Sequence, residues 1–358
     1  MRTIPIILLL ILSHSTSAQQ VNNLKIEQPL LKDLFVWGDH IIAEKDHTNI
    51  HKFYSCDTIS KQLIPLTIKG NSEVLYLAES NSFLFAIVKN QNTFSLISKG
   101  KTAQSWNSET LFQGFDLIRE AKFVANDSLL LFITADKIHY KARSSGWQSI
   151  LLNSLVDLKS LIFAYGSVPQ HCLVTANSLY LGYDHGEWSG ALIEIPFISK
   201  NNIVFKKGKT ILEDNIKAIC RTTNDTIWIA TGLAHMAAER SGIYKYKNKS
   251  LQEILWSKPS LSLPKKSDLS AFCLNNKEEP LFVASILGVF KIESDKLKQV
   301  INANLYISYS MKDYSVGSFP EAMYADKNDN LFIASRSLGV FLYTKTGNGY
   351  KFTQLTFE

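Results

Sequence analysis

The chain of 358 residues is 46% hydrophobic and 20% charged, with a mean hydropathy of −0.02. This balance excludes a disordered chain and indicates an ordered protein. The net charge of +6 comes from lysines scattered along the sequence. Such a distribution favours solvated loops and edge strands over a surface for acidic polymers.

The N-terminus has the three parts of a secretory signal. Met1-Arg2 is followed by an apolar run from Ile4 to Leu12 and then by the small residues Thr16-Ser17-Ala18. The run is too short to cross a bilayer as a stable anchor, so we expect cleavage after Ala18 and no transmembrane segment. Residues 1–18 are therefore predicted to be a signal peptide and residues 19–358 a single secreted or periplasmic domain. Export argues against a nucleic-acid partner.

One short pattern recurs along the chain. In its clearest copy, Asn224 to Gly232, the turn formers Asn224 and Asp225 precede Ile-Trp-Ile, which predicts a tight turn followed by a buried strand. We find seven copies, whose first strand residues are Ile41, Phe83, Leu129, Leu179, Ile227, Leu281 and Leu331. Their average spacing of about 48 residues is typical of propeller blades.

Each repeat is predicted to form four short strands, ordered from the inner to the outer edge of a blade. In the fifth repeat these strands are Ile216–Thr222, Thr226–Thr231, Gly242–Tyr246 and Leu251–Trp256. In the seventh repeat they are Ala322–Asp326, Asn330–Ser335, Gly339–Thr344 and Tyr350–Phe357. The segment Val21–Pro29 is expected to clip onto the last blade and close the ring. The predicted fold is thus an all-β, seven-bladed β-propeller of four-stranded antiparallel blades.

The best copies resemble the repeat of the two-component-regulator-type propellers of bacterial surface proteins. That repeat reads Asn/Asp-Gly-x-Leu-Trp-Ile-Gly-Thr, followed by a glycine and an aromatic-bearing strand. Asn224–Tyr246 and Asp329–Tyr343 are similar to it, with Thr226 and Asn330 in place of the middle glycine. The resemblance implies a propeller fold in an exported, Bacteroidetes-like protein, and it implies no particular reaction.

Four connections in repeats four to seven are longer than the others. They are Tyr183–Gly190 and Gly232–Gly242 between second and third strands, and Ser257–Asp268 and Asn302–Pro320 between blades. All four open on one face of an up-and-down propeller. Because loops on a rigid scaffold commonly carry function, the loops of blades four to seven are predicted to form a recognition face.

Histidines and glutamates in two of these loops have the chemistry for acid–base catalysis or for binding a divalent metal. The candidate catalytic residues are His185, Glu187, His235 and Glu239. The same side chains are also suited to direct contact with a ligand, or to hydrogen bonds that hold the loops in place.

Aromatic and cationic residues of the same face are candidates for ligand binding. They are Trp188, Arg240, Tyr309 and Tyr314. Aromatic faces suit stacking on sugar rings or on apolar peptide side chains, so the expected ligand is a carbohydrate, a protein or a peptide. The alternative is that the aromatic residues pack the long loops onto the ring.

Carboxylates near the starts of the innermost strands are expected to surround the mouth of the central channel. Glu73, Glu120 and Glu321 are the candidates for a metal site, where oxygen ligands would suit a divalent cation such as calcium. Propeller lactonases look similar in placing acidic residues there. The alternative is that water and neighbouring groups satisfy these carboxylates.

The four cysteines, Cys56, Cys172, Cys220 and Cys273, have two interpretations. The last three lie seven or eight residues before their strand starts, and these matching positions predict buried fillers of the inner strands with free thiols. In an exported protein the alternative is a disulfide, such as Cys172–Cys220 or Cys220–Cys273.

Two classes of function fit these features. The first is an exported, monomeric binding or interaction module that uses the loops of blades four to seven. The second is a propeller hydrolase or lyase that acts on a carbohydrate, lactone or small ester with the histidines and glutamates of the same face. A sensor-like propeller that works with a kinase on a separate chain is a third possibility.

Overall fold

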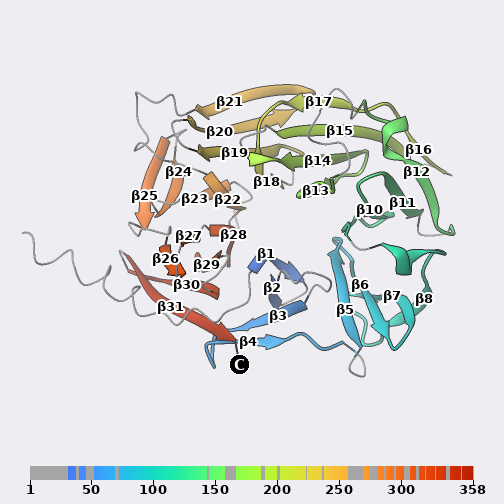
Figure 1. The fold of residues 1–358 in the computed structure, drawn as a ribbon, viewed down its shortest axis with the longest axis horizontal. Helices are drawn as coiled ribbons and strands as arrows, with labels where there is room; N and C mark the ends of the chain where they lie inside the picture. The colour runs from blue at the N-terminus through green and yellow to red at the C-terminus, as the bar shows by residue number, and fades with distance from the viewer. Residues whose placement is uncertain are drawn as a thin grey trace, which may run out of the picture.

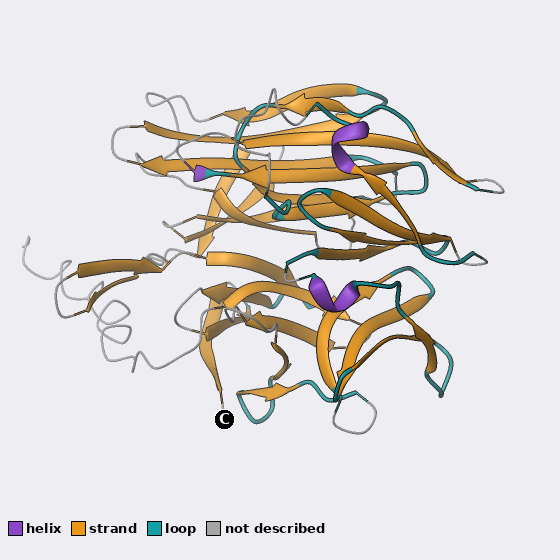
Figure 2. Cartoon of the chain, turned by 45° about the vertical axis from the view of Figure 1, so that its right-hand side comes forward, coloured by secondary structure: helices purple, strands orange, loops and turns teal. Residues whose placement is uncertain are grey.

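The structure is a computed structural model, and it describes most of the chain from residue 31 to residue 357. The described ranges are 31–37, 40–45, 52–68, 72–118, 120–142, 145–157, 167–186, 190–199, 202–222, 224–235, 238–256, 269–274, 280–285, 288–293, 296–301, 307–311, 314–318, 320–326, 328–335, 339–347 and 349–357. Within them strands dominate, with short 3₁₀ turns such as η1 (Phe115–Leu117) and η2 (Leu152–Ser154) between blades (Figure 2). The strands form seven four-stranded antiparallel blades around a ring (Figure 1). The predicted seven-bladed propeller is confirmed.

The first three blades each use four strands that are consecutive in the chain. Blade one has β1 (Leu31–Trp37), β2 (His40–Lys45), β3 (Lys52–Asp57) and β4 (Gln62–Pro65). Blade two has β5 (Glu73–Glu79), β6 (Phe83–Asn90), β7 (Thr93–Gly100) and β8 (Asn107–Thr110). Blade three has β9 (Lys122–Ala125), β10 (Leu129–Ile133), β11 (Lys137–Ala142) and β12 (Gln148–Leu151).

Blade four differs from the others in its divided outer strand. It has β13 (His171–Val174), β14 (Ser178–Asp184) and β15 (Gly190–Ser199), and β15 pairs with both β16 (Ile203–Phe205) and β17 (Lys209–Leu212). The residues between these two pieces dock on the connection that follows blade three, because Gly208 N–H donates to Leu155 O at 2.9 Å. A Cβ at Gly208 would lie 2.9 Å from Glu194 O, so this close approach requires glycine.

The remaining blades return to four consecutive strands. Blade five has β18 (Ile216–Arg221), β19 (Ile227–His235), β20 (Ala238–Lys247) and β21 (Ser250–Trp256). Blade six has β22 (Leu269–Leu274), β23 (Pro280–Ser285), β24 (Gly288–Glu293) and β25 (Lys296–Ile301). Blade seven has β28 (Pro320–Ala325), β29 (Leu331–Ser335), β30 (Gly339–Thr346) and β31 (Gly349–Phe357). A separate hairpin of β26 (Ile307–Met311) and β27 (Tyr314–Ser318) lies between blades six and seven in the chain.

The second strand of each blade was predicted most accurately. These strands begin at His40, Phe83, Leu129, Ser178, Ile227, Pro280 and Leu331, each within one residue of the predicted start. They are apolar on both faces because each blade is packed between two others, and successive side chains of a strand point to opposite faces. In β10, Leu129, Leu131 and Ile133 pack against blade four, whereas Leu130 and Phe132 pack against blade two.

The core is distributed around the ring. Among the described residues, buried apolar side chains form seven clusters, and each cluster joins two adjacent blades. The cluster between blades five and six, for example, contains Trp228 and Ile243 from one blade and Val283 and Phe290 from the other. A small isolated sheet cannot bury both of its faces, so each blade depends on its neighbours for stability.

Blades one and seven meet in two ways. Leu31 and Leu63 of blade one share a buried cluster with Phe332 of blade seven. In addition, the outer strands β4 and β31 pair in parallel through Gln62 with Thr356 and Leu63 with Phe357. Described strands from both ends of the chain therefore close the ring. The segment Val21–Pro29, which was predicted to do so, lies outside the described residues.

A buried carboxylate links blades four and five. Glu194 on β15 is 6% exposed, and it accepts hydrogen bonds from the hydroxyls of Tyr246 at 2.7 Å, Tyr180 at 3.3 Å and Ser178 at 3.1 Å. The ammonium of Lys209 lies 3.5 Å away. Since Tyr246 belongs to blade five and the other partners belong to blade four, the carboxylate fixes how the two sheets approach each other.

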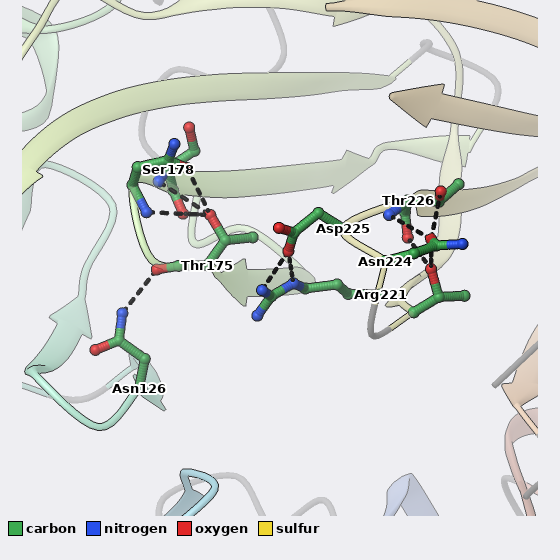
Figure 3. Close-up of polar contacts among 9 residues, drawn as sticks. Asn126, Thr175, Ser178, Arg221, Asn224, Asp225 and Thr226 are labelled. Atoms are coloured by element: carbon green, nitrogen blue, oxygen red, sulfur yellow. Dashed lines mark hydrogen bonds and ion pairs between the residues drawn. The ribbon is translucent and has the colours of Figure 1, made fainter. Parts of the chain in front are cut away.

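The turns between first and second strands explain the recurring Asn, Asp, Ser and Thr residues. Thr175 Oγ1 accepts from Ser178 N–H at 3.0 Å, and Asn224 Oδ1 accepts from the Thr226 hydroxyl at 2.7 Å (Figure 3). Asn126 Nδ2 donates to Thr175 O at 2.7 Å and so joins the turns of blades three and four. These residues therefore shape turns, as expected for short polar side chains before strands.

Candidate functional site

Two segments predicted as loops are instead β-ribbons on one rim of the propeller, which we call the upper rim. It is the rim at which second strands turn into third strands. In blade five, Thr231 pairs with Ile216 on β18 and with Gly242 on β20. The ladder then continues between Gly232–His235 and Ala238–Ser241, beyond Ile216, the first residue of β18. This blade-five ribbon extends roughly 13 Å beyond the inner strand.

The second correction concerns Asn302–Pro320, which was predicted as an irregular connection. It contains the inserted hairpin of β26 and β27, paired from Ile307 with Ser318 to Met311 with Tyr314. The hairpin leaves from the upper rim, because Ile301 pairs with the first residues of β24 and Pro320 pairs with Ser335 at the end of β29. The backbone register of the hairpin sets Tyr309 opposite Val316 and Met311 opposite Tyr314.

Between blades four and five, the upper rim carries a cluster of interacting polar groups. Asp184 ends β14, and its carboxylate lies 2.8 Å from the ammonium of Lys217 on β18, with both side chains 21% exposed. The same carboxylate accepts from Gly186 N–H at 3.0 Å. Asp184 N–H donates to the side chain of Gln170 at 2.9 Å. Asp184 therefore holds the beginning of the blade-four turn against two neighbouring segments.

Asn215, which is fully buried, ties the blade-four turn to the base of the blade-five ribbon. Its side-chain amide donates to Gly186 O at 2.6 Å, and its backbone carbonyl oxygen accepts from Gly232 N–H at 3.2 Å. A Cβ at Gly190 would lie 2.3 Å from Tyr183 O and 2.7 Å from Asp214 O. Glycine is therefore required where these three chain segments meet.

His185, a predicted catalytic residue, belongs to this cluster. Its Nε2 lies 3.4 Å from Ser167 Oγ, and its ring stacks on Tyr183 with 6.1 Å between centroids. Burial lowers the pKa of His185 below its usual value, and the nearby Asp184 opposes this effect. The imidazole is consequently neutral at neutral pH, the state in which it can accept a proton.

His171 at the start of β13 lies nearby and was not predicted. Its pKa is lowered to about 3, mainly by burial. The cations Lys122 and Lys217 also lower the pKa, and the carboxylate of Asp184 opposes them. Lys122, His171 and Lys217 lie on the inner strands of blades three, four and five. This part of the channel wall therefore holds a neutral imidazole between two cations.

The other predicted catalytic and ligand-binding residues are only partly described. Glu187 and Trp188 lie outside the described residues. His235, Glu239 and Arg240 lie in the blade-five ribbon, where Ala234 pairs with Glu239 and Leu233 pairs with Arg240. Tyr309 and Tyr314 lie in the inserted hairpin. For all five, the structure gives the backbone position, and their roles stay predictions.

The predicted metal ligands lie in three different blades. Glu73 begins β5 and is half-buried, Glu120 is exposed just before β9, and Glu321 lies in β28. In the described part of the chain, no three His, Cys, Asp or Glu side chains are grouped closely enough to hold a metal ion. The side chain of Glu321 is outside that part, so the calcium site stays a prediction.

Three of the four cysteines are free thiols, as predicted: Cys56, Cys172 and Cys220. Burial raises the pKa of each of them to about 12, which keeps the sulfur protonated and unreactive. Cys172 and Cys220 lie on the inner strands β13 and β18, where they are half-buried and pack against the apolar clusters; the prediction called for buried fillers. The side chain of Cys273 lies outside the described residues.

Comparisons with known proteins give structural neighbours only. No protein-family model matches the chain, and no curated protein matches its sequence. The structure is similar to PorZ, a bacterial surface component of the type-IX secretion system of Porphyromonas gingivalis. The two sequences are 12% identical, the match covers 94% of this chain and 48% of PorZ, and the TM-score is 0.29. The structure is also similar to YCF48 bound to D1 peptide, with 10% identity, 89% and 94% coverage and a TM-score of 0.49.

A third neighbour is an enzyme, the acylaminoacyl peptidase of Pyrococcus horikoshii. It has 9% identity, with 92% of this chain and 53% of that chain covered, and a TM-score of 0.46. This chain thus spans about half the length of PorZ and of the peptidase. Identities this low indicate the shape of the fold alone, and none of the neighbours assigns an activity. Among the described residues, no helix has the length and apolar character needed to cross a membrane.

Proposed function

We propose that this chain is an exported binding module that captures an extended polypeptide on the upper rim of blades four to seven. The observation that carries the proposal is the presence of two ribbons on that rim. Among the strands that the structure describes, Leu233–His235 and Ala238–Arg240 pair only with each other. The two strands of the inserted hairpin likewise pair only with each other in the described part of the chain. Within these limits each ribbon therefore has two unpaired edges. Such edges offer rows of backbone donors and acceptors to an added strand.

The polar cluster at the foot of the blade-five ribbon supports this function. Asn215 and the Asp184–Lys217 pair connect the blade-four turn, the inner strand of blade five and the ribbon base. A preorganised base reduces the ordering that a ribbon must undergo when it binds. The inserted hairpin contains Tyr309 and Tyr314, and aromatic side chains are enriched in the buried centres of protein interfaces.

Selection from a displayed peptide library on the mature chain, residues 19–358, tests the proposal. The affinity of the selected peptides is then measured for a variant in which Asn-Gly replaces residues 233–240. The cut leaves Gly232 and Ser241 as the last backbone pair. Asn-Gly is chosen because it closes two-residue hairpins. The matched control replaces Gln91-Asn92, the same turn of blade two, with Asn-Gly. We expect at least tenfold weaker binding for the shortened ribbon and unchanged binding for the control.

A second variant removes residues 307–318, the inserted hairpin, and a glycan array runs in parallel. Equal binding by the wild type and by both shortened variants would contradict the proposed surface. Selective retention of one class of glycan, with no peptide selected, would replace the polypeptide by the carbohydrate ligand that the aromatic residues also predict.

One observation favours a second candidate function, a hydrolase acting on a small ester. The Ser167 hydroxyl lies 3.4 Å from Nε2 of His185, whose pKa is lowered. A serine beside a neutral imidazole can act as a nucleophile with its base, and such contacts are often longer in structures without substrate. Hydrolysis of p-nitrophenyl acetate that is lost in both Ser167→Ala and His185→Gln would support this candidate. Hydrolysis that persists in both variants would remove it.

A further inference from the structure

A cleft between blades two and three lies on the lower rim, opposite the ribbons. It has a volume of about 110 Å³. Blade two contributes residues from β6, β7 and β8, and blade three contributes residues from β10, β11 and the turn Asn126–Ser128. The lower rim is the end at which first strands turn into second strands, so this cleft is separate from the surface proposed above.

One side of the cleft is apolar. Phe83 and Phe85 lie along β6 with ring centroids 6.0 Å apart, and Leu96 and Leu130 complete this side from the two facing sheets. Leu96 is 2% exposed and Leu130 is 7% exposed. A cavity of about 150 Å³ lined by such residues can hold benzene, so this smaller cleft suits a branched or linear aliphatic side chain.

The other side offers hydrogen-bond donors. The side chain of Lys141 is 16% exposed, and its ammonium donates to Ser145 O at 2.9 Å and lies 3.3 Å from Glu109 Oε2. An ammonium has three N–H donors, and no further acceptor for it is found among the described residues. The hydroxyl of Ser98 likewise makes no hydrogen bond within that part of the chain. An acceptor placed against the apolar wall would therefore meet both donors.

The charges of the lining decide what kind of acceptor fits. Glu109 and Asp127 are acidic and Lys141 is the one cation that lines the cleft, so a ligand that brings a carboxylate would be repelled. A neutral carbonyl would be accepted. The side chain of Lys141 is only partly exposed, whereas its charged partner Glu109 is 43% exposed.

We infer that this cleft is a second binding site, a socket for one aliphatic side chain of a polypeptide, either leucine, isoleucine or methionine. The backbone carbonyl next to that side chain accepts hydrogen bonds from Lys141 and Ser98. Phe83 and Phe85 contact the aliphatic group. A single inserted residue of this kind is a common anchor of protein recognition.

Methyl NMR on the full mature chain tests the socket with N-acetyl-leucine methylamide as the probe. We expect saturable shifts of the Leu96 and Leu130 methyl signals with a Kd on the order of 1 mM, typical of a probe this small. Leu179 and Leu181 of blade four report on the rest of the fold and should not shift. Probes that are too large or charged, N-acetyl-tryptophan methylamide and N-acetyl-leucine, should bind at least fivefold more weakly.

Two pairs of variants extend the test. Ser98→Leu fills the socket and should abolish the shifts, whereas Ser95→Leu, on the opposite face of the same strand, should leave them. Lys141→Met removes the donor and should weaken binding about tenfold, whereas Lys137→Met, at the far end of the same strand, should not. The probe is added to the wild type up to about 20 times that Kd, roughly 20 mM. No shift at this concentration would overturn the proposal. Equal binding of the tryptophan and leucine amides would overturn it as well.

Discussion

Acidification should destabilise this protein through His171, a histidine held neutral in the channel wall. In the unfolded chain a histidine binds a proton as the pH falls through about 6.5, whereas the folded protein resists protonation of His171 until about pH 3. Between these values the unfolded state binds more protons, so stability is lost as the pH falls. The causes of the lowered pKa are burial first and then the cation Lys122, with Asp184 opposing them.

The magnitude follows from these two values. Lowering the pH from 7.5 to 5.0 protonates the unfolded histidine almost fully and leaves the folded one neutral, which costs about 2 kcal/mol of unfolding free energy. At pH 5.0 any folded-state pKa below about 4 gives the same cost to within about 0.1 kcal/mol. Between pH 5.0 and about pH 4 the cost should rise by about a further 1.3 kcal/mol, and it levels off as the pH approaches the folded-state pKa of about 3.

Urea unfolding of the wild type and of His171→Gln at pH 7.5 and 5.0 measures this cost. Glutamine keeps a polar side chain of similar size and does not titrate. The wild type should lose about 2 kcal/mol more than the variant between the two pH values. His139 and His185 also have lowered pKa values because they are buried, and their contributions are present in both proteins and cancel. Parallel pH dependence of the two proteins would refute the reasoning.

Further predictions test the packing and electrostatics of blades four and five. Gly190→Ala should lower the free energy of unfolding by at least about 2 kcal/mol, because its Cβ would lie 2.3 Å from Tyr183 O. In the control Gly146→Ala the new Cβ meets nothing within 4 Å, so the change should stay within about 0.5 kcal/mol. Equal urea midpoints for the two variants would contradict this. Lys217→Met should raise the pKa of His171 in an NMR titration, because one of the cations that lowers it is gone; an unchanged pKa would show that the cation has no effect. Tyr246→Phe should lower the free energy of unfolding by about 1 to 2 kcal/mol, because it removes a hydrogen-bond donor from buried Glu194. The hydroxyl of Tyr140 donates to exposed Gln148, so the control Tyr140→Phe should cost less than about 0.5 kcal/mol. Equal losses in the two variants would disprove the buried link.

The blades were predictable because their second strands are apolar on both faces. A run such as Leu129–Ile133 is buried throughout, and its turn residues lie directly before it. The blade-five ribbon was missed because Ala234, Ala238, Glu239 and Arg240 have low strand propensity. The backbone pairing of Gly232–His235 with Ala238–Ser241 overrides that propensity. The inserted hairpin did carry a signal, the alternation of Ile307-Ser-Tyr-Ser-Met311, which predicts a strand with two different faces.

The candidate site was less predictable than the fold, because its residues come from different blades. His185 was found from its position in a long loop. Asp184, Asn215 and Lys217 are ordinary residues at strand ends when read along the sequence, and the ring brings them into hydrogen-bond contact. His171 carries no local signal of its neutrality, since its lowered pKa depends on burial and on cations of blades three and five.

The parallel contact between β4 and β31 has a mechanical consequence. Within the described strands, blades one and seven are each formed by one uninterrupted stretch of chain, and two residue pairs join their outer edges. Tension applied between residues 31 and 357 should therefore part these two sheets before it unravels either of them. A circularly permuted protein, cut in the turn between β11 and β12 and joined across the old ends, should move this weak point to blade three.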